Sequence, residues 1–129
     1  MIRTWMIAAI ALAGSNGTIS AQDAAAGEQV FRRFCLPCHE VGEAAKVKLG
    51  PPLNGLEGRK TGTVEGFNYS PANKASDIVW GDASFAKYIR APMQEMKGTR
   101  MAFVGIKNDK EIADLWAYLQ QFAPDGTKK

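Results

Sequence analysis

Cysteine and histidine are both scarce in this sequence, whose 129 residues include two cysteines and one histidine. A structural zinc site normally uses four cysteine or histidine ligands, so three such residues argue against zinc. The two cysteines and the histidine also lie within one short stretch, "RRFCLPCHEVG", at residues 32–42. Any chemistry that depends on these residue types is therefore concentrated in that stretch.

The start of the chain lacks a hydrophobic run long enough to cross a membrane. The apolar run "WMIAAIALA" has nine residues, whereas a transmembrane helix needs about 20. The run follows Arg3 and precedes a polar stretch that ends at Ala21, an arrangement typical of a cleaved export signal. We therefore predict a secretory signal peptide at residues 1–21 and one domain at residues 22–129. An uncleaved membrane anchor is the alternative.

An excess of charge of one sign is also missing. The chain has 16 basic and 13 acidic residues, and removal of residues 1–21 leaves 108 residues and takes away one basic residue, Arg3. With 15 basic residues against 13 acidic ones, the net charge is too weak to indicate a nucleic-acid partner. A local basic patch can still steer an acidic partner. Export would place the domain outside the cytoplasm, where a disulfide is allowed.

Patterns that predict β-strands are thin, and no internal repeat is visible, but helix patterns are clear. The segment "DAAAGEQVFRRF" begins with Asp23 as a helix cap, and apolar residues recur at helical spacing after it. Near the other end of the chain, Asn108 and Glu111 form a capping-box pattern ahead of an apolar stripe. Gly27 in the first of these helices is expected to let another helix approach closely.

Shorter elements are expected between these two helices. Ser70 is a candidate cap with Pro71 at the first helical position, and a third main helix is expected from Asp82 to about Ala91, where Pro92 stops it. The remaining segments are rich in glycine and proline, which predicts long loops. Loops longer than about 12–15 residues need a special reason in a compact domain. We therefore expect a central group other than side chains to organise them.

The stretch Cys35-Leu36-Pro37-Cys38-His39 has the C-x-x-C-H pattern for covalent attachment of a c-type haem. Each thiol adds to one vinyl group of the porphyrin, and the adjacent histidine becomes the proximal ligand of the iron. A haem would also supply the flat apolar plate around which long loops can pack. A thioredoxin-like redox pair is the main alternative, but it needs flanking β-α-β units. A disulfide would leave His39 unexplained.

Methionine is the next candidate for the second iron ligand, because no second histidine exists. Residues 22–129 retain Met93, Met96 and Met101, and a soft thioether suits haem iron. Met101 lies in the expected loop "KGTRMAFVG", where the backbone is free to bring sulfur to the iron. Met93 and Met96 are expected to fill gaps in the core.

Stretches distributed over most of residues 22–129 carry a family resemblance: "FRRFCLPCHEVG", "LGPPLNGLEGRKTGTVEGFNYSPANK", "YIRAP", "KGTRMAFVGIK" and "DLWAYLQ". Together they resemble a class I cytochrome c, most like the bacterial cytochrome c2 type. The resemblance implies an all-α fold with three main helices, short helices and long loops packed around one covalent haem c. It also implies that Met101, in the G-T-[KR]-M-x-F pattern, is the axial ligand that accompanies His39.

Supporting roles around the haem follow from the same resemblance. The carbonyl of Pro51 would accept the second N–H of His39, and Arg59, Tyr69 and Trp80 would donate to the haem propionates. A further group of residues would lie near the methionine sulfur or hold an internal water, namely Tyr88 and Thr99 for the first role and Asn73 for the second. The contact between the first and last helices would involve Gly27, Phe31, Leu115 and Tyr118.

The function implied by the resemblance is that of a monomeric periplasmic electron carrier and not of an enzyme. The donor would be a quinol-oxidising cytochrome bc complex, and the acceptor a photosynthetic reaction centre or a terminal oxidase. Docking would use basic residues around the exposed haem edge, namely Arg32, Arg33, Lys46, Lys48, Arg100 and Lys107. The ring of lysines is thinner than in many relatives, because Met93 and Gln94 stand where those relatives carry lysines. A haem enzyme or ligand sensor with an open sixth site is the alternative.

Overall fold

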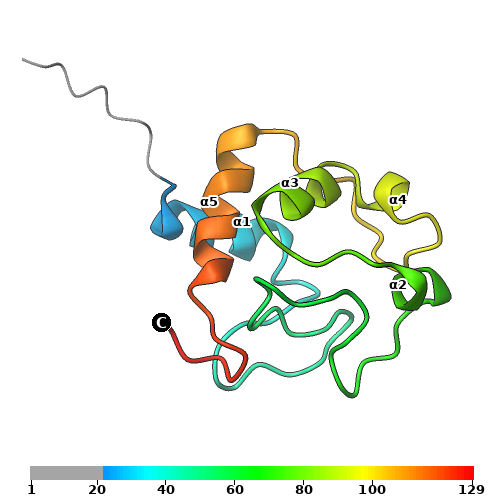
Figure 1. The fold of residues 1–129 in the computed structure, drawn as a ribbon. Coiled ribbons are helices and arrows are strands. Elements are labelled where there is room, and N and C mark those ends of the chain that lie inside the picture. Colours follow the sequence, from blue (N-terminus) through cyan, green and yellow to red (C-terminus); the bar gives the residue numbers. More distant parts are fainter. Residues whose placement is uncertain (1–21) are drawn as a thin grey trace, which may run out of the picture.

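The computed structural model describes residues 22–129, so the signal peptide predicted at residues 1–21 lies outside the described residues. This part of the chain forms five helices, labelled in Figure 1: α1 (Ala24–Phe34), α2 (Pro71–Ala75), α3 (Asp82–Arg90), α4 (Pro92–Glu95) and α5 (Asp109–Gln120). Pairing of the β type within residues 22–129 is limited to two isolated bridges. The predicted all-α architecture, with α1, α3 and α5 as its main helices, is confirmed. None of the helices in the described range has the length and apolar character of a membrane span.

The two terminal helices, α1 and α5, begin where their caps predict. Asp23 accepts hydrogen bonds from the backbone N–H groups of Ala25 and Ala26 at 3.0 and 3.1 Å. The Asn108 side chain accepts the backbone N–H of Glu111 at 3.0 Å. These bonds satisfy donors that have no partner within the helix. The predicted capping box is only half formed, because the carboxylate of Glu111 pairs with Arg33 instead.

Proline positions set the ends of the middle helices. Ser70 caps α2 and Pro71 occupies its first position, as predicted. The third main helix ends at Arg90, close to the expected end, and Pro92 then starts the short helix α4. A proline suits a first helical position because its missing N–H would have no helical acceptor there.

Helices α1 and α5 pack against each other at one side of the molecule, and the loops lie on the other side (Figure 1). A Cβ atom added to Gly27 would lie 1.9 Å from the backbone oxygen of Asp114, so the two helix backbones nearly touch at this point. The rings of Phe31 and Tyr118 meet with centroids 5.5 Å apart, and Leu115 is completely buried. The contact predicted between the first and last helices is confirmed.

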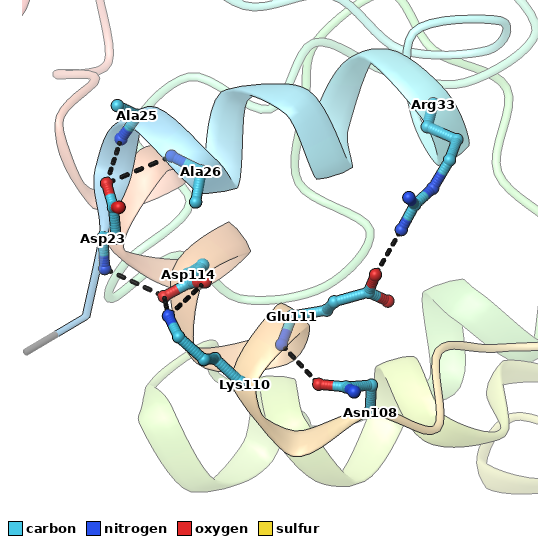
Figure 2. A network of polar contacts seen from close by, with 8 residues as sticks. All are labelled: Asp23, Ala25, Ala26, Arg33, Asn108, Lys110, Glu111 and Asp114. Atoms are coloured by element: carbon cyan, nitrogen blue, oxygen red, sulfur yellow. Dashed lines mark hydrogen bonds and ion pairs between the residues drawn. The ribbon is translucent and has the colours of Figure 1, made fainter. Parts of the chain in front are cut away.

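A network of polar contacts links α1 to α5 along the side of this helix pair, as Figure 2 shows. The buried carboxylate of Asp114 accepts the backbone N–H of Asp23 at 2.9 Å and the ammonium of Lys110 at 2.8 Å. Burial alone would raise the pKa of Asp114, but the hydrogen bonds from Lys110 and Asp23 outweigh it and lower the pKa. The ionised carboxylate therefore links the start of α1 to α5.

An isolated bridge between Lys60 and Val79 joins two loop segments that are far apart in sequence. Next to this bridge, the backbone N–H of Trp80 donates to the carbonyl oxygen of Arg59 at 3.0 Å. Two of the predicted propionate donors, Arg59 and Trp80, are thereby brought side by side.

The Gly27→Ala substitution tests the close approach of α1 and α5. Alanine favours a helix over glycine by about 1 kcal/mol, but here its methyl group would collide with the Asp114 backbone. We expect the free energy of unfolding to fall by about 1–3 kcal/mol or more, as in other overpacked cores. The measurement is denaturant unfolding, with Gly81→Ala as the control, because a Cβ there meets no atom closer than 4.0 Å. Equal stability of the two variants would contradict the close contact.

The Asp114→Asn substitution tests the charge in the polar network. Because the folded pKa of Asp114 is lowered, its ionised form contributes stability above the pKa of the unfolded chain, and this contribution is lost as the pH falls through the folded pKa. We expect the variant to be less stable than the parent at pH 7, with the difference narrowing towards pH 3. Thermal unfolding across that pH range measures it. A difference independent of pH would show that ionisation has no part.

Candidate functional site

A central cavity of about 550 Å³ lies between the helices and the loops. This volume falls in the range of about 300–1,000 Å³ that is usual for cofactor and small-molecule sites. All eleven site residues predicted from the sequence line it, namely Cys35, Cys38, His39, Pro51, Arg59, Tyr69, Asn73, Trp80, Tyr88, Thr99 and Met101.

The C-x-x-C-H stretch forms a tight turn at the end of α1. The backbone N–H groups of Cys38 and His39 donate to the Cys35 carbonyl at 3.0 and 2.8 Å, and the N–H of Cys35 donates to Phe31 in α1. The helix end therefore fixes where the turn begins. Both thiols and the imidazole border the same cavity as a result.

The two cysteines carry free thiols in this structure. Burial, followed by the influence of Cys38, raises the pKa of the Cys35 thiol to about 12. A thiol-disulfide catalyst needs a thiolate with a lowered pKa, so this environment argues against a redox pair. No three His, Cys, Asp or Glu side chains gather into a metal-binding group anywhere in residues 22–129.

The imidazole of His39 is held in one orientation by the loop that contains Gly50 and Pro51. Its Nδ1 lies 2.7 Å from the carbonyl oxygen of Pro51. A carbonyl only accepts, so Nδ1 carries the proton and the lone pair of Nε2 remains available as a ligand. Burial is the main cause that lowers the pKa of His39, with smaller contributions in the same direction from Arg59 and Lys48. The ring is thereby kept neutral, as metal ligation requires.

Met101 lies in the loop between α4 and α5 and borders the same cavity as His39. The hydroxyl of Tyr88 donates to the Met101 sulfur at 3.2 Å, and the hydroxyl oxygen of Thr99 accepts the Met101 backbone N–H at 3.1 Å. Burial raises the pKa of Tyr88, with a smaller opposing effect from Thr99. The phenol therefore stays protonated and remains a donor to the sulfur.

The other two methionines of the described range differ in how far they are buried. Met96 is buried, as expected for a residue that fills a gap in the core. Met93 is 48% exposed, so the prediction that it fills the core is wrong. Helix α4 has only four residues and buries Pro92, which leaves Met93 on the surface. Neither residue borders the central cavity.

Some hydrogen-bond donors that line the cavity have no carboxylate partner among the described residues. The guanidinium of half-buried Arg59 donates to the carbonyl oxygens of Pro52 and Asn54 at 3.1 and 2.8 Å, and no ion pair within residues 22–129 includes it. The hydroxyl oxygen of buried Tyr69 accepts the Val64 N–H at 3.0 Å, which leaves the phenolic proton free to donate. A buried cation needs a partner, and a carboxylate on a cofactor would be one.

A second polar feature of the cavity is the side-chain oxygen of Asn73. It is the buried side-chain polar atom of the described residues that has no hydrogen-bond partner. Such atoms normally bond to protein or to an ordered water. A covalently attached haem with carboxylate side groups fits all the features of this cavity. These features are the apolar volume, the two neighbouring thiols, the neutral imidazole, the thioether and the donors that have no carboxylate partner.

Several lining residues carry no motif and were missed by the sequence analysis. The rings of Phe34 and Phe103 pack with centroids 5.9 Å apart. The ring centroids of Phe67 and Tyr69 lie 4.7 Å apart. All four aromatic rings border the cavity. Each of the three phenylalanines lies within two positions of a predicted site residue in the sequence. That proximity is the signal that would have found them.

The six predicted docking residues fall into two groups. Arg32 pairs with Glu28, Arg33 with Glu111, and Lys48 with Glu40. The other three are in no ion pair within the described range, namely Lys46, Arg100 and Lys107. Arg100 also borders the cavity and donates to the Asn68 carbonyl at 3.1 Å.

Comparison with known proteins agrees with this geometry. The Cytochrome c family model matches residues 24–123. A "Cytochrome c2" of Rhodoplanes tepidamans is 61% identical over 108 residues, which cover 84% of this chain and all of the relative. A "Cytochrome c2" of Blastochloris viridis is 53% identical over 118 residues, which cover 92% of each chain. A "Cytochrome c-550" of Nitrobacter winogradskyi is 53% identical over 107 residues, covering 83% of this chain and 97% of the relative.

The Gly50→Ala substitution tests how the loop holds His39. A Cβ atom at position 50 would lie 2.4 Å from Cε1 and 2.7 Å from Nδ1 of His39, so the ring has to move. We expect the bond to Pro51 to break and unfolding to become easier by about 1–3 kcal/mol. Absorption spectra and denaturant unfolding measure both effects, and Gly81→Ala is the control. A normal spectrum with normal stability would show that the ring is not confined.

Proposed function

This chain belongs to the cytochrome c family, and from that premise we propose that it works as a periplasmic electron carrier rather than as an enzyme. The family match and the relatives identify it as an electron-transfer cytochrome with a covalently attached haem c. The observation that carries the proposal is that one cavity gathers Cys35, Cys38, His39 and Met101.

Different side chains of the cavity would bind different parts of the haem. When bound, the haem supplies an iron that passes between the ferric and ferrous states by one electron. Cys35 and Cys38 would form thioethers with the haem, and Nε2 of His39 and the sulfur of Met101 would ligate its iron. An iron ligated by both side chains would offer no site to a substrate, as a carrier requires.

The surroundings of the ligands favour the reduced state. A methionine opposite a histidine raises the reduction potential. The hydroxyl of Tyr88, which donates to the Met101 sulfur, withdraws electron density from it and acts in the same direction. Arg59, Tyr69 and Trp80 line the cavity and would bind the propionates, and Asn73, which also lines it, would hold an internal water.

The periplasmic location rests on the predicted signal peptide at residues 1–21. The cytochrome c2 of Rhodoplanes tepidamans aligns over its full length with 108 residues of this chain. The same number of residues remains here after cleavage between Ala21 and Gln22. This agreement supports a mature domain at residues 22–129.

Redox partners are proposed from the likeness to proteins named cytochrome c2. The donor is a quinol-oxidising cytochrome bc complex, and the acceptor is a photosynthetic reaction centre or a terminal oxidase. The carrier works as a monomer without nucleic acid and docks through its basic residues. Lys46 is the strongest of the six candidates, because its side chain forms neither an ion pair nor a hydrogen bond among the described residues. Arg100 and Lys107 are also in no ion pair there, but Arg100 donates to the Asn68 carbonyl and Lys107 to the Arg90 and Val104 carbonyls. Complementary charge mainly speeds the encounter.

The Met101→Leu substitution tests the proposal against a haem enzyme or sensor with an open sixth site. The swap nearly conserves volume but removes the sulfur. We expect the ferric absorption band at the red edge of the visible spectrum, typical of sulfur ligation, to disappear, and cyanide to bind far more readily.

Met96→Leu is the matched control, because Met96 is equally apolar and does not border the cavity. It should keep the band and resist cyanide. If the band survives in the Met101 variant, Met101 is not the ligand. If the parent protein itself binds cyanide at once, the sixth site is open and the carrier proposal fails.

A further inference from the structure

The segment at residues 46–51 is attached to the haem-attachment turn by more than the bond between Pro51 and His39. The backbone N–H of Gly50 donates to the Cys38 carbonyl at 2.9 Å. The ammonium of Lys48 donates to the carbonyl of Leu36, between the two cysteines, at 2.8 Å. The loop therefore holds the turn at three successive points, and one of those contacts brings a positive charge.

The Lys48 ammonium is fixed in place, unlike a typical surface lysine. Its side chain is 33% exposed, and a carboxylate oxygen of Glu40 lies 3.9 Å from the nitrogen. Lys46, two positions earlier, offers a contrast within the same loop. Only its backbone N–H is bonded, to the Glu40 carboxylate at 2.8 Å, and its side chain is in no ion pair among the described residues. The loop thus contains one immobilised cation, Lys48, and one unattached cation, Lys46, two positions apart in the sequence.

We propose that Lys48 is a positioning residue of the haem site, whose ammonium braces the attachment turn and whose fixed charge raises the reduction potential. This inference rests on the proposed function. It replaces the docking role expected for Lys48 from the sequence, because an ammonium committed to a backbone carbonyl and a carboxylate has less to offer a partner.

The direction of the effect follows from Coulomb's law. The ferric state carries one more positive charge than the ferrous state, so a cation held beside the attachment turn disfavours it. Salt screens partly buried charges much less than exposed ones. The charge of Lys48 should therefore act on the potential at physiological ionic strength, whereas that of Lys46 should be largely screened. Glu40 acts in the opposite direction and offsets part of the effect.

The experiment is a redox titration of the haem-containing protein at 0.15 M salt with three variants. In Lys48→Gln, the ratio of reduced to oxidised protein at a fixed applied potential should fall about two- to threefold, which is about 18–28 mV for one electron. Lys46→Gln, which makes the same charge change two positions away, should shift the ratio by less than half as much. Lys48→Arg should stay near the parent, because a guanidinium keeps the charge and can still donate to Leu36.

Each outcome bears on the inference. Equal shifts in the two glutamine variants would overturn it, because any charge in the loop would then act alike. A drop in Lys48→Arg as large as in Lys48→Gln would also overturn it, because shape rather than charge would be responsible. Unchanged hydrogen exchange at the Gly50 amide in Lys48→Gln would refute the bracing role. Failure of the underlying proposal is distinguishable, because the parent protein would then bind cyanide at once or show no haem absorption.

Discussion

A large flat cofactor at the centre of a short chain is the constraint on which the other features of this molecule depend. A cavity of about 550 Å³ inside the domain exposes apolar surface unless a group fills it, and each buried Å² of such surface contributes about 25 cal/mol. Residues of several loops line this cavity, so the group that fills it contacts those loops at the same time. The side chains around the cavity therefore stabilise the fold and hold the haem through the same contacts.

The pair formed by α1 and α5 provides the fixed reference for this arrangement. Gly27 lets the two backbones touch, and the attachment turn begins where α1 ends. The histidine side of the site is then set by the turn and by the loop at residues 46–51. The methionine side is set by Tyr88 in α3 and by Thr99. Anchoring the two proposed iron ligands, His39 and Met101, independently would make the site rigid, which would keep the reorganisation on electron transfer small.

Local chemistry explains which features were predictable from the sequence. Caps, prolines and the C-x-x-C-H spacing act over a few residues, so the helix starts and the attachment turn could be found without a fold. Met101 was separated from Met93 and Met96 mainly by family resemblance, because the choice depends on the path of a loop. The partner of Glu111 and the contrast between Lys46 and Lys48 depend on tertiary contacts, which no local pattern records. The lining phenylalanines were missed for the same reason.

The most direct test of the central role of the haem is a thermal unfolding curve by circular dichroism for the chain with and without the attached cofactor. The Cys35→Ala, Cys38→Ala double variant provides the chain without it. We predict that this chain loses most of its helical signal and shows no cooperative transition, whereas the haem-containing protein unfolds in one sharp step. A colourless chain with the same helical signal and the same sharp transition would contradict the account, because the loops would then be organised without the cofactor.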